Sequence, residues 1–181
     1  MKPRQHSLSP VEGFSPGVGL ALAAMEEVRG QLHRIVEELS DEDLARLAFP
    51  GAHSVGALVL HIGEAEWWWI NCIVLGHELT DTDRAQAYWD VLVDPDAFAA
   101  KNYSARFCLE TIGRIRGETR AFLAALDDRE LENIYGHTHG GRTIEASLRW
   151  ILHHLVDHEA QHKGQILMLK RLLGLKTESL V

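Results

Sequence analysis

Four long stretches of the chain place apolar residues at the three- and four-residue spacing of a helix that buries one face. Serine, threonine and glycine residues near their ends are typical helix caps and stops. The predicted helices span residues 16–39, 54–75, 104–126 and 143–173, with a short helix over 81–90 and a loop or small hairpin over 127–142. No convincing strand alternation appears elsewhere. We therefore expect an all-α chain, a four-helix bundle that forms a single domain over residues 1–181, with residues 1–15 as a loose lead-in.

The last predicted helix carries histidines where aliphatic residues are expected. Its apolar residues form one stripe that must face the core, namely Leu148, Ile151, Leu155, Ile166, Leu169 and Leu173. His162 lies within this stripe, and His158 lies roughly 40° to one side at ~100° per residue. Burying two imidazoles is costly unless something accepts their polarity. Two neutral imidazoles one turn apart can bind one divalent metal ion; the alternative is two core histidines bonded to each other or to backbone groups.

A third ligand should come from another helix, and His61 is the candidate. It lies on an inward-looking stripe of the second predicted helix, whereas His33, the alternative, lies on a more polar face. Cys72 shares the direction of His61 but lies ~16 Å further along the axis, too far for the same ion. Glu64, one turn from His61, and Gln165 are expected to orient ligand imidazoles from behind. For Glu64 a surface carboxylate is the competing interpretation.

The segment from His158 to His162 also matches HExxH, in which a zinc protease uses the glutamate as general base. The longer protease motif requires a glycine and a third histidine where this chain has Gln165 and Met168. A di-iron bundle would require a second Glu-x-x-His, and no other histidine here has a glutamate three residues before it. Both interpretations are therefore disfavoured.

Two segments resemble the DinB/YfiT-like superfamily of metal-dependent enzymes: SVGALVLHIGEAEWWW, which contains His61, and LHHLVDHEAQHKGQI, which contains His158 and His162. The resemblance covers nearly the whole chain. It implies a four-helix bundle with up-down-down-up order and a divalent metal held by these three histidines. It also implies, more weakly, a reaction that uses a low-molecular-weight thiol.

These observations lead to a hypothesis of a metal-dependent thiol S-transferase, or a related isomerase or hydrolase, that acts on small molecules. The metal could be Zn, Ni, Fe, Co or Mn, because three histidines accept all of them. Glu159 or His154 would handle protons. The alternatives are a non-catalytic metal-binding or stress-response module and a purely structural bundle.

Charge and composition limit the partners. The net charge of −8 and the lack of a basic stripe argue against nucleic acid. The most apolar region, residues 55–74, contains polar and charged residues and is not expected to cross a membrane. The apolar run over 18–25 continues into a helical pattern, which argues against a signal peptide. Cys72 and Cys108 are expected to be free thiols, and the protein is expected to be cytoplasmic.

The second predicted helix has a second apolar line, formed by Val59, Gly63, Trp67, Ile70 and Val74. A helix with two apolar faces is either central or at an interface. Because glycine permits close approach and tryptophan is frequent in interfaces, the pattern predicts a homodimer formed through this line. Geometry places Trp67 outward, Trp68 near the metal side and Trp69 in the core.

Overall fold

The computed structural model describes residues 7–101, 103–139 and 142–177. Its four long helical elements are α1 (Pro16–Val36), α3 (Val55–Trp67) continued by the π-helical segment η1 (Trp68–Val74), α6 (Ala105–Ala124) and α7 (Leu148–Leu172). The shorter elements are α2 (Asp41–Ala45), α4 (Asp81–Arg84), α5 (Pro95–Lys101), the 3-10 helix η2 (Asp128–Glu132) and the strands β1 (Ile134–His139) and β2 (Arg142–Ser147).

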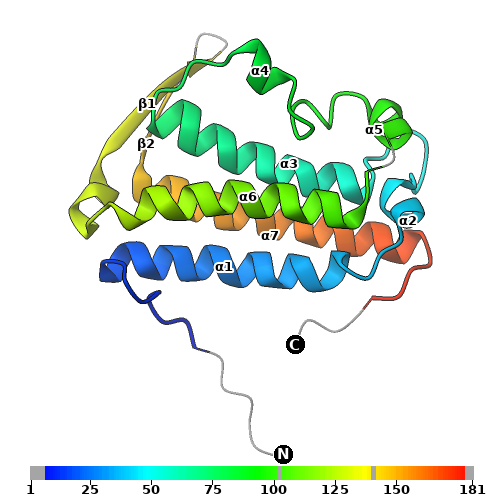
Figure 1. Cartoon of the computed structure of the whole chain (residues 1–181), viewed down its shortest axis with the longest axis horizontal. Coiled ribbons are helices and arrows are strands. Elements are labelled where there is room, and N and C mark those ends of the chain that lie inside the picture. Colours follow the sequence, from blue (N-terminus) through cyan, green and yellow to red (C-terminus); the bar gives the residue numbers. More distant parts are fainter. Residues whose placement is uncertain (1–6, 102, 140–141, 178–181) are drawn as a thin grey trace, which may run out of the picture.

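The four long helices pack as one bundle, which confirms the predicted fold class. In Figure 1, α1 and α7 run in one direction and α3 and α6 run in the other. In chain order this is up-down-down-up. The connection between the two parallel helices, α3 and α6, must return along the bundle, which is why it is long and carries α4 and α5.

Serine caps set the starts of three of the four long helices. The Ser54 hydroxyl accepts a hydrogen bond from the Ala57 amide, and Ser104 does the same for Phe107. The predicted start of the last helix at Thr143 is wrong. Residues 142–147 instead form β2, which pairs with β1 in antiparallel register, and Ser147 caps α7 through the Trp150 amide. The β-branched residues Thr143 and Ile144 favour this extended conformation.

The face of α3 that was predicted to form a dimer interface is covered within the chain. A Cβ added to Gly63 would lie 2.8 Å from Cγ2 of Ile112, so α6 packs directly against this glycine. The Trp67 ring is 7% exposed and contacts Tyr88 and Trp89 of the long connection. Val59 and Ile70 are buried, and Val74 packs against the core. The interface prediction is therefore wrong for these residues, whereas the homodimer itself stays a prediction.

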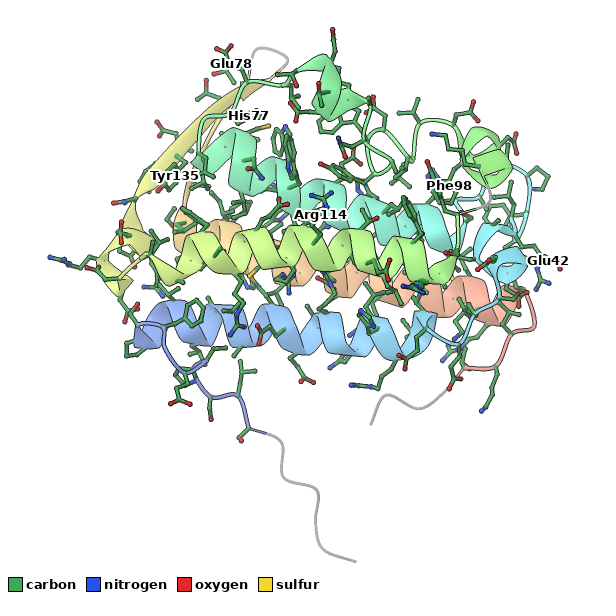
Figure 2. The ribbon with its side chains drawn as sticks, viewed as in Figure 1. Glu42, His77, Glu78, Phe98, Arg114 and Tyr135 are labelled. Atoms are coloured by element: carbon green, nitrogen blue, oxygen red, sulfur yellow. The ribbon has the colours of Figure 1, made fainter. Side chains whose placement is uncertain are left out.

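The long connection adds to the core at the start of α3. Phe98 of α5 is buried, and its ring would lie 3.0 Å from a Cβ added to Gly56. Figure 2 shows Phe98 between α5 and the beginning of α3. The small residue at position 56 lets α5 cover this end of the bundle.

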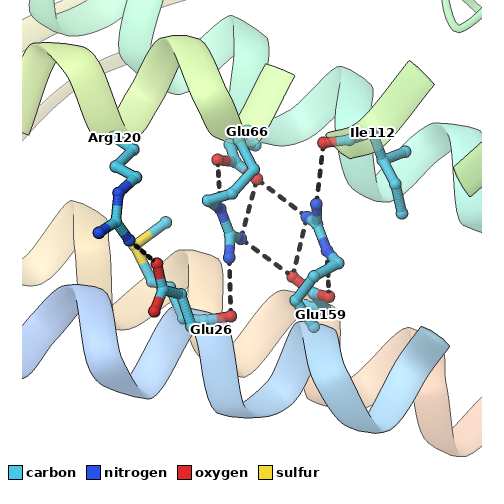
Figure 3. Close-up of polar contacts among 8 residues, drawn as sticks. Glu26, Glu66, Ile112, Arg120 and Glu159 are labelled. Carbon is cyan, nitrogen blue, oxygen red and sulfur yellow. Dashed lines mark hydrogen bonds and ion pairs between the residues drawn. The ribbon is translucent and has the colours of Figure 1, made fainter. Parts of the chain in front are cut away.

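Four charged residues form a buried layer across the middle of the bundle, one from each long helix: Arg29, Glu66, Arg116 and Glu159. Arg29 Nε lies 2.7 Å from Glu159 Oε1, and its Nη2 lies 2.9 Å from Glu66 Oε2. Arg116 Nε lies 2.7 Å from Glu66 Oε1, and its Nη2 lies 3.3 Å from Glu159 Oε2 (Figure 3). We call these four side chains the charged layer.

The charged layer is neutral overall, and its outward donors are satisfied. Arg29 Nη1 donates to the carbonyl of Ile112, and Arg116 Nη1 donates to that of Met25. Burial alone would raise the pKa of Glu66, but the Arg116 and Arg29 guanidinium groups outweigh it and lower that pKa. Burial likewise opposes the charge of Arg29, yet the carboxylates of Glu159 and Glu66 raise its pKa. All the observed shifts therefore favour the ionised forms.

The apolar core lies on both sides of the charged layer as two clusters. One contains Leu32, Leu60, Ile112 and Ile166, among others, and the second contains Leu22, Met25, Leu123 and Leu152. Cys108 is buried in the first, where burial raises the pKa of its thiol to about 12. Cys72 and Cys108 are both free, as predicted. Among the described residues, no helix combines the length and apolar character that crossing a bilayer requires.

Replacing one member of the charged layer should destabilise the protein strongly. We expect Glu66→Gln to lower the free energy of unfolding by about 3–5 kcal/mol, because two buried guanidinium groups would then share one carboxylate. Urea denaturation followed by circular dichroism measures this change. Glu110→Gln is the matched control, since Glu110 pairs with Arg106 on the exposed face of α6 and should leave stability unchanged within error. Equal midpoints for the two variants would contradict the prediction.

Candidate metal centre and its cavity

Three histidines from two helices converge in the groove between α3 and α7. α3 contributes His61, and α7 contributes His158 and His162 one turn apart. One ring nitrogen of each lies within 4.8 Å of those of the other two. The two α7 rings approach most closely, with 3.1 Å between their Nε2 atoms. The structure thus brings together the three side chains that the sequence predicted as metal ligands.

Two polar side chains hold these imidazoles from behind. Glu64 Oε2 lies 2.9 Å from Nδ1 of His61, and Gln165 Oε1 lies 2.7 Å from Nδ1 of His162. An oxygen of this kind accepts a hydrogen bond, so each Nδ1 carries the proton and Nε2 keeps its lone pair. This is the arrangement in which a ligand histidine is oriented by a partner behind it. Glu64 and Gln165 therefore occupy the positions predicted for them.

The local environment keeps the imidazoles of α7 neutral. Burial lowers the pKa of His158 from 6.5 to about 3, and the neighbouring His162, His61 and His154 rings act in the same direction. Burial also lowers the pKa of His162, assisted by His61 and His53 and opposed by the hydrogen bond that His162 donates to Gln165. Neutral rings have the free lone pairs that a metal requires.

The donor set fits a divalent metal ion of intermediate softness. Three imidazole nitrogens are ligands for Zn, Ni, Co, Fe or Mn, and in catalytic zinc sites they leave further coordination positions open. Without a cation, the 3.1 Å contact between the Nε2 atoms of His158 and His162 is a hydrogen bond if one ring carries its proton on Nε2. The three imidazoles nevertheless fit a cation, because one nitrogen of each can be directed toward a shared point.

A cavity of about 360 Å³ opens beside His61. Aromatic and aliphatic side chains of η1 and of the long connection form most of its wall: Trp68, Trp69, Trp89, Leu92 and Val93. Glu64 and Asp90 add two carboxylates. We call this space the tryptophan cavity. Its volume lies within the range that small-molecule sites occupy.

Glu64 connects the metal centre to the wall of the tryptophan cavity. Its Oε1 accepts a hydrogen bond from the Asp90 amide at 2.8 Å, while Oε2 faces His61. Asp90 has a φ of 51°, and no other non-glycine residue in the described part of the chain has a positive φ. This conformation is uncommon for a residue with a side chain. One carboxylate thus holds both a ligand and the loop beside it.

The two residues predicted to handle protons lie in different environments. His154 is half-buried at the edge of the centre, where its ring stacks on Trp150 and lies 5.9 Å from that of His158. Burial lowers the pKa of His154. Glu159 is 2% exposed and belongs to the charged layer, so it is not positioned at the metal centre. The expectation that Glu159 acts there as a base is corrected accordingly.

Sequence reasoning missed Arg29, Arg116 and the loop around Asp90. A charged residue within an apolar stripe was the available signal for the arginines, since Arg29 follows Met25 by four residues and precedes Leu32 by three. For Asp90 no local signal exists. Its role depends on a loop that returns to α3.

Comparison with known proteins agrees with this geometry. The family model described as mycothiol-S-transferase matches residues 21–173, most of the chain. The chain belongs to the mycothiol-S-transferase family. Among curated proteins no match was found.

Solved structures share the fold of this family member at low sequence identity. A DinB-like protein from Bacillus cereus matches with a TM-score of 0.61 and 20% identity, over 96% of this chain and 99% of that one. YfiT from Bacillus subtilis, described as "a probable metal-dependent hydrolase with an unusual four-helix bundle topology", gives 0.52 and 20%, over 97% and 95%. A conserved protein from Enterococcus faecalis gives 0.64 and 16%, over 86% and 96%. These structures therefore share the fold that the resemblance to the DinB/YfiT-like superfamily implied.

Removing the partner of His61 should weaken metal binding. We expect Glu64→Ala to raise the Kd for Zn by about 10–100-fold, because the imidazole would lose the group that orients it. Competition with a chromophoric chelator measures this Kd. Glu118→Ala, a change on the exposed face of α6, should leave it unaltered. An unchanged Kd for Glu64→Ala would show that the carboxylate does not support the ligand.

The metal-free protein should lose stability in mild acid. His158 titrates near 6.5 when unfolded and near 3 when folded, so between these values the unfolded chain binds more protons. The contribution of His158 to stability is fully present above about pH 6.5 and is lost as the pH falls towards the pKa of the folded protein. The free energy of unfolding of wild type and His158→Asn, measured by urea titration between about pH 7.5 and about pH 4.5, isolates this contribution. If the difference in free energy of unfolding between the two proteins does not change with pH, the prediction is wrong.

Proposed function

We propose that this protein is a divalent-metal-dependent thiol S-transferase that acts on small molecules. The observation that carries the proposal is the convergence of His61, His158 and His162 within 4.8 Å beside an open cavity. A purely structural bundle would gain nothing from three half-buried imidazoles that share one point. A closed centre would favour a non-catalytic metal-binding module, whereas the adjoining cavity favours catalysis.

In the proposed reaction, the metal ion activates the thiol, and residues of the chain hold the ion and exclude water. A divalent cation at the three histidines would act as a Lewis acid that lowers the pKa of a bound thiol or water. His61, His158 and His162 would hold it, and Glu64 and Gln165 would keep their Nε2 atoms directed toward it. The indole rings of Trp68, Trp69 and Trp89 would exclude water around the sulfur.

His154 is the residue best placed to accept the thiol proton. Its lowered pKa keeps the ring neutral near pH 7, and it lies on the same side of α7 as His158. Glu159 supports the site differently, because its ion pairs fix the rotation of α7. The polar low-molecular-weight thiol would occupy the tryptophan cavity, where the carboxylates of Glu64 and Asp90 can accept hydrogen bonds.

Hydrolysis is the second candidate, because a water ligand would be activated by the same chemistry. The description of YfiT as a probable metal-dependent hydrolase supports it. A thiol requirement separates the two: the transferase consumes thiol and electrophile in equal amounts, and the hydrolase consumes neither thiol nor its adducts. The predicted homodimer, the cytoplasmic location and the absence of nucleic-acid partners belong to the same proposal.

Metal content is the decisive first experiment. We expect about one metal ion per chain in untagged wild type and fewer than roughly a tenth of that in His158→Ala, because two imidazoles hold a divalent ion poorly. Mass spectrometry of the metals measures both. His153→Ala is the matched control, since His153 neighbours the site on α7 but is exposed.

The metal-loaded protein is then tested for transfer. Loss of free thiol against a panel of reactive electrophiles should occur with wild type and His153→Ala and should be abolished in His158→Ala. Equal metal content in all three proteins would overturn the assignment of the ligands. Metal binding without any thiol consumption would favour the hydrolase or the non-catalytic module.

A further inference from the structure

A second hollow lies on the other side of the metal centre from the tryptophan cavity. It has a volume of about 250 Å³ and is formed by the loop before α3, the first turn of α3 and the C-terminal half of α7. Its lining residues are Phe49, Gly51, Ala52, His53, Leu58, Gln165, Met168, Leu169 and Leu172. We call it the apolar hollow.

The apolar hollow is adjacent to the metal ligands on both helices that supply them. On α3, Leu58 precedes His61 by three residues, ~4.5 Å along the axis, and Ala65 of the tryptophan cavity follows His61 by four. On α7, Gln165 lines the hollow and bonds Nδ1 of His162. The metal centre therefore lies between the two spaces.

The lining of the apolar hollow differs in chemistry from that of the tryptophan cavity. None of its residues is acidic, lysine or arginine, whereas the tryptophan cavity has Glu64 and Asp90. Three large apolar side chains remain exposed around it: Phe49 by 55%, Met168 by 61% and Leu172 by 60%. A neutral, apolar molecule would gain the most from covering them.

The size of the apolar hollow suits a small compound. Its volume of about 250 Å³ lies just below the ~300–1,000 Å³ that drug-sized ligands occupy. One lining residue, His53, has an Nδ1 atom that is buried and makes no hydrogen bond among the described residues.

We propose that the apolar hollow binds the second substrate, a small neutral apolar electrophile, while the thiol occupies the tryptophan cavity. This inference rests on the proposed transferase function for its reaction but not for its binding. In the transfer, the thiol proton passes to a base and the sulfur forms a bond to the electrophilic carbon. The bond from that carbon to its leaving group breaks, and the leaving group departs with the electron pair.

Binding is tested with dinitrobenzene, which resembles an aromatic electrophile but has no leaving group. We expect the double variant Met168→Gln, Leu172→Gln to raise its Kd about tenfold, because two apolar contacts are lost. Both residues are exposed, so the fold should tolerate the change. The matched control is the double variant Leu20→Gln, Ile144→Gln, which replaces exposed apolar residues elsewhere and should leave the Kd within about twofold. Chemical-shift titration of the full chain measures each Kd.

Turnover is tested with chlorodinitrobenzene, which releases chloride on reaction with a thiol. The Met168→Gln, Leu172→Gln variant should raise the KM for the electrophile about tenfold and leave the KM for the thiol unchanged. If no protein turns over but dinitrobenzene binding weakens only in this variant, the transferase proposal fails and the binding site stands.

Three results would overturn the inference. The first is an equal Kd for dinitrobenzene in wild type and the Met168→Gln, Leu172→Gln variant, which would place the ligand elsewhere. The second is an equal rise in the Kd for dinitrobenzene in the Leu20→Gln, Ile144→Gln control. The third is a wild-type dimer, seen by sedimentation, that dissociates in the Met168→Gln, Leu172→Gln variant. In that case the apolar hollow is an interface between copies of this chain.

Discussion

The charged layer determines how the bundle is assembled. Each long helix supplies one charge, and each guanidinium lies between two carboxylates from other helices. Such a set tolerates little rotation or sliding, because a misplaced helix would leave a buried charge unpaired. Apolar contacts alone would permit more rotations and axial positions of each helix. The polar layer therefore contributes specificity of packing, and the two hydrophobic clusters contribute most of the driving force.

The metal centre depends on this constraint. Residues 158 and 159 are about 100° apart around α7, so a helix that directs Glu159 to the interior directs His158 toward the groove with α3. Glu66 acts similarly on α3, because it fixes the helix that carries His61 and Glu64. The ligands are thus positioned by ion pairs behind them, not by contacts among themselves.

The sequence predicted the bundle from the apolar pattern of each helix. It also predicted that His61, His158 and His162 lie together with Glu64 and Gln165 beside them, because each of these residues has a recognisable place within one helix. It placed His162 in the core stripe and treated Glu159 as polar. The structure reverses this: Glu159 is buried with Leu152 and Leu155, and His162 is half-buried. A glutamate can be recognised as a core residue only together with the arginines of two other helices, and single-helix periodicity does not contain that information.

The other errors also have long-range causes. Trp67 was expected to point outward because α3 has two apolar faces, but the long connection and α6 cover the second face. Thr143 looked like a helix cap because the local sequence does not reveal that residues 142–147 pair with residues 134–139. Trp69 was expected in the core; it is half-buried and packs against the second hydrophobic cluster, and it also lines the tryptophan cavity.

The π-helical segment η1 has an evolutionary consequence. A wider turn arises when one residue is inserted into an α-helix, and here it begins directly after the portion of α3 that carries His61 and Glu64. Such an insertion rotates everything that follows it and leaves the ligands where they were. A lineage could therefore exchange the aromatic wall of the tryptophan cavity in one genetic event, with the three histidines untouched. Diversity of cavity walls around a constant histidine cluster is the outcome that such a helix makes accessible.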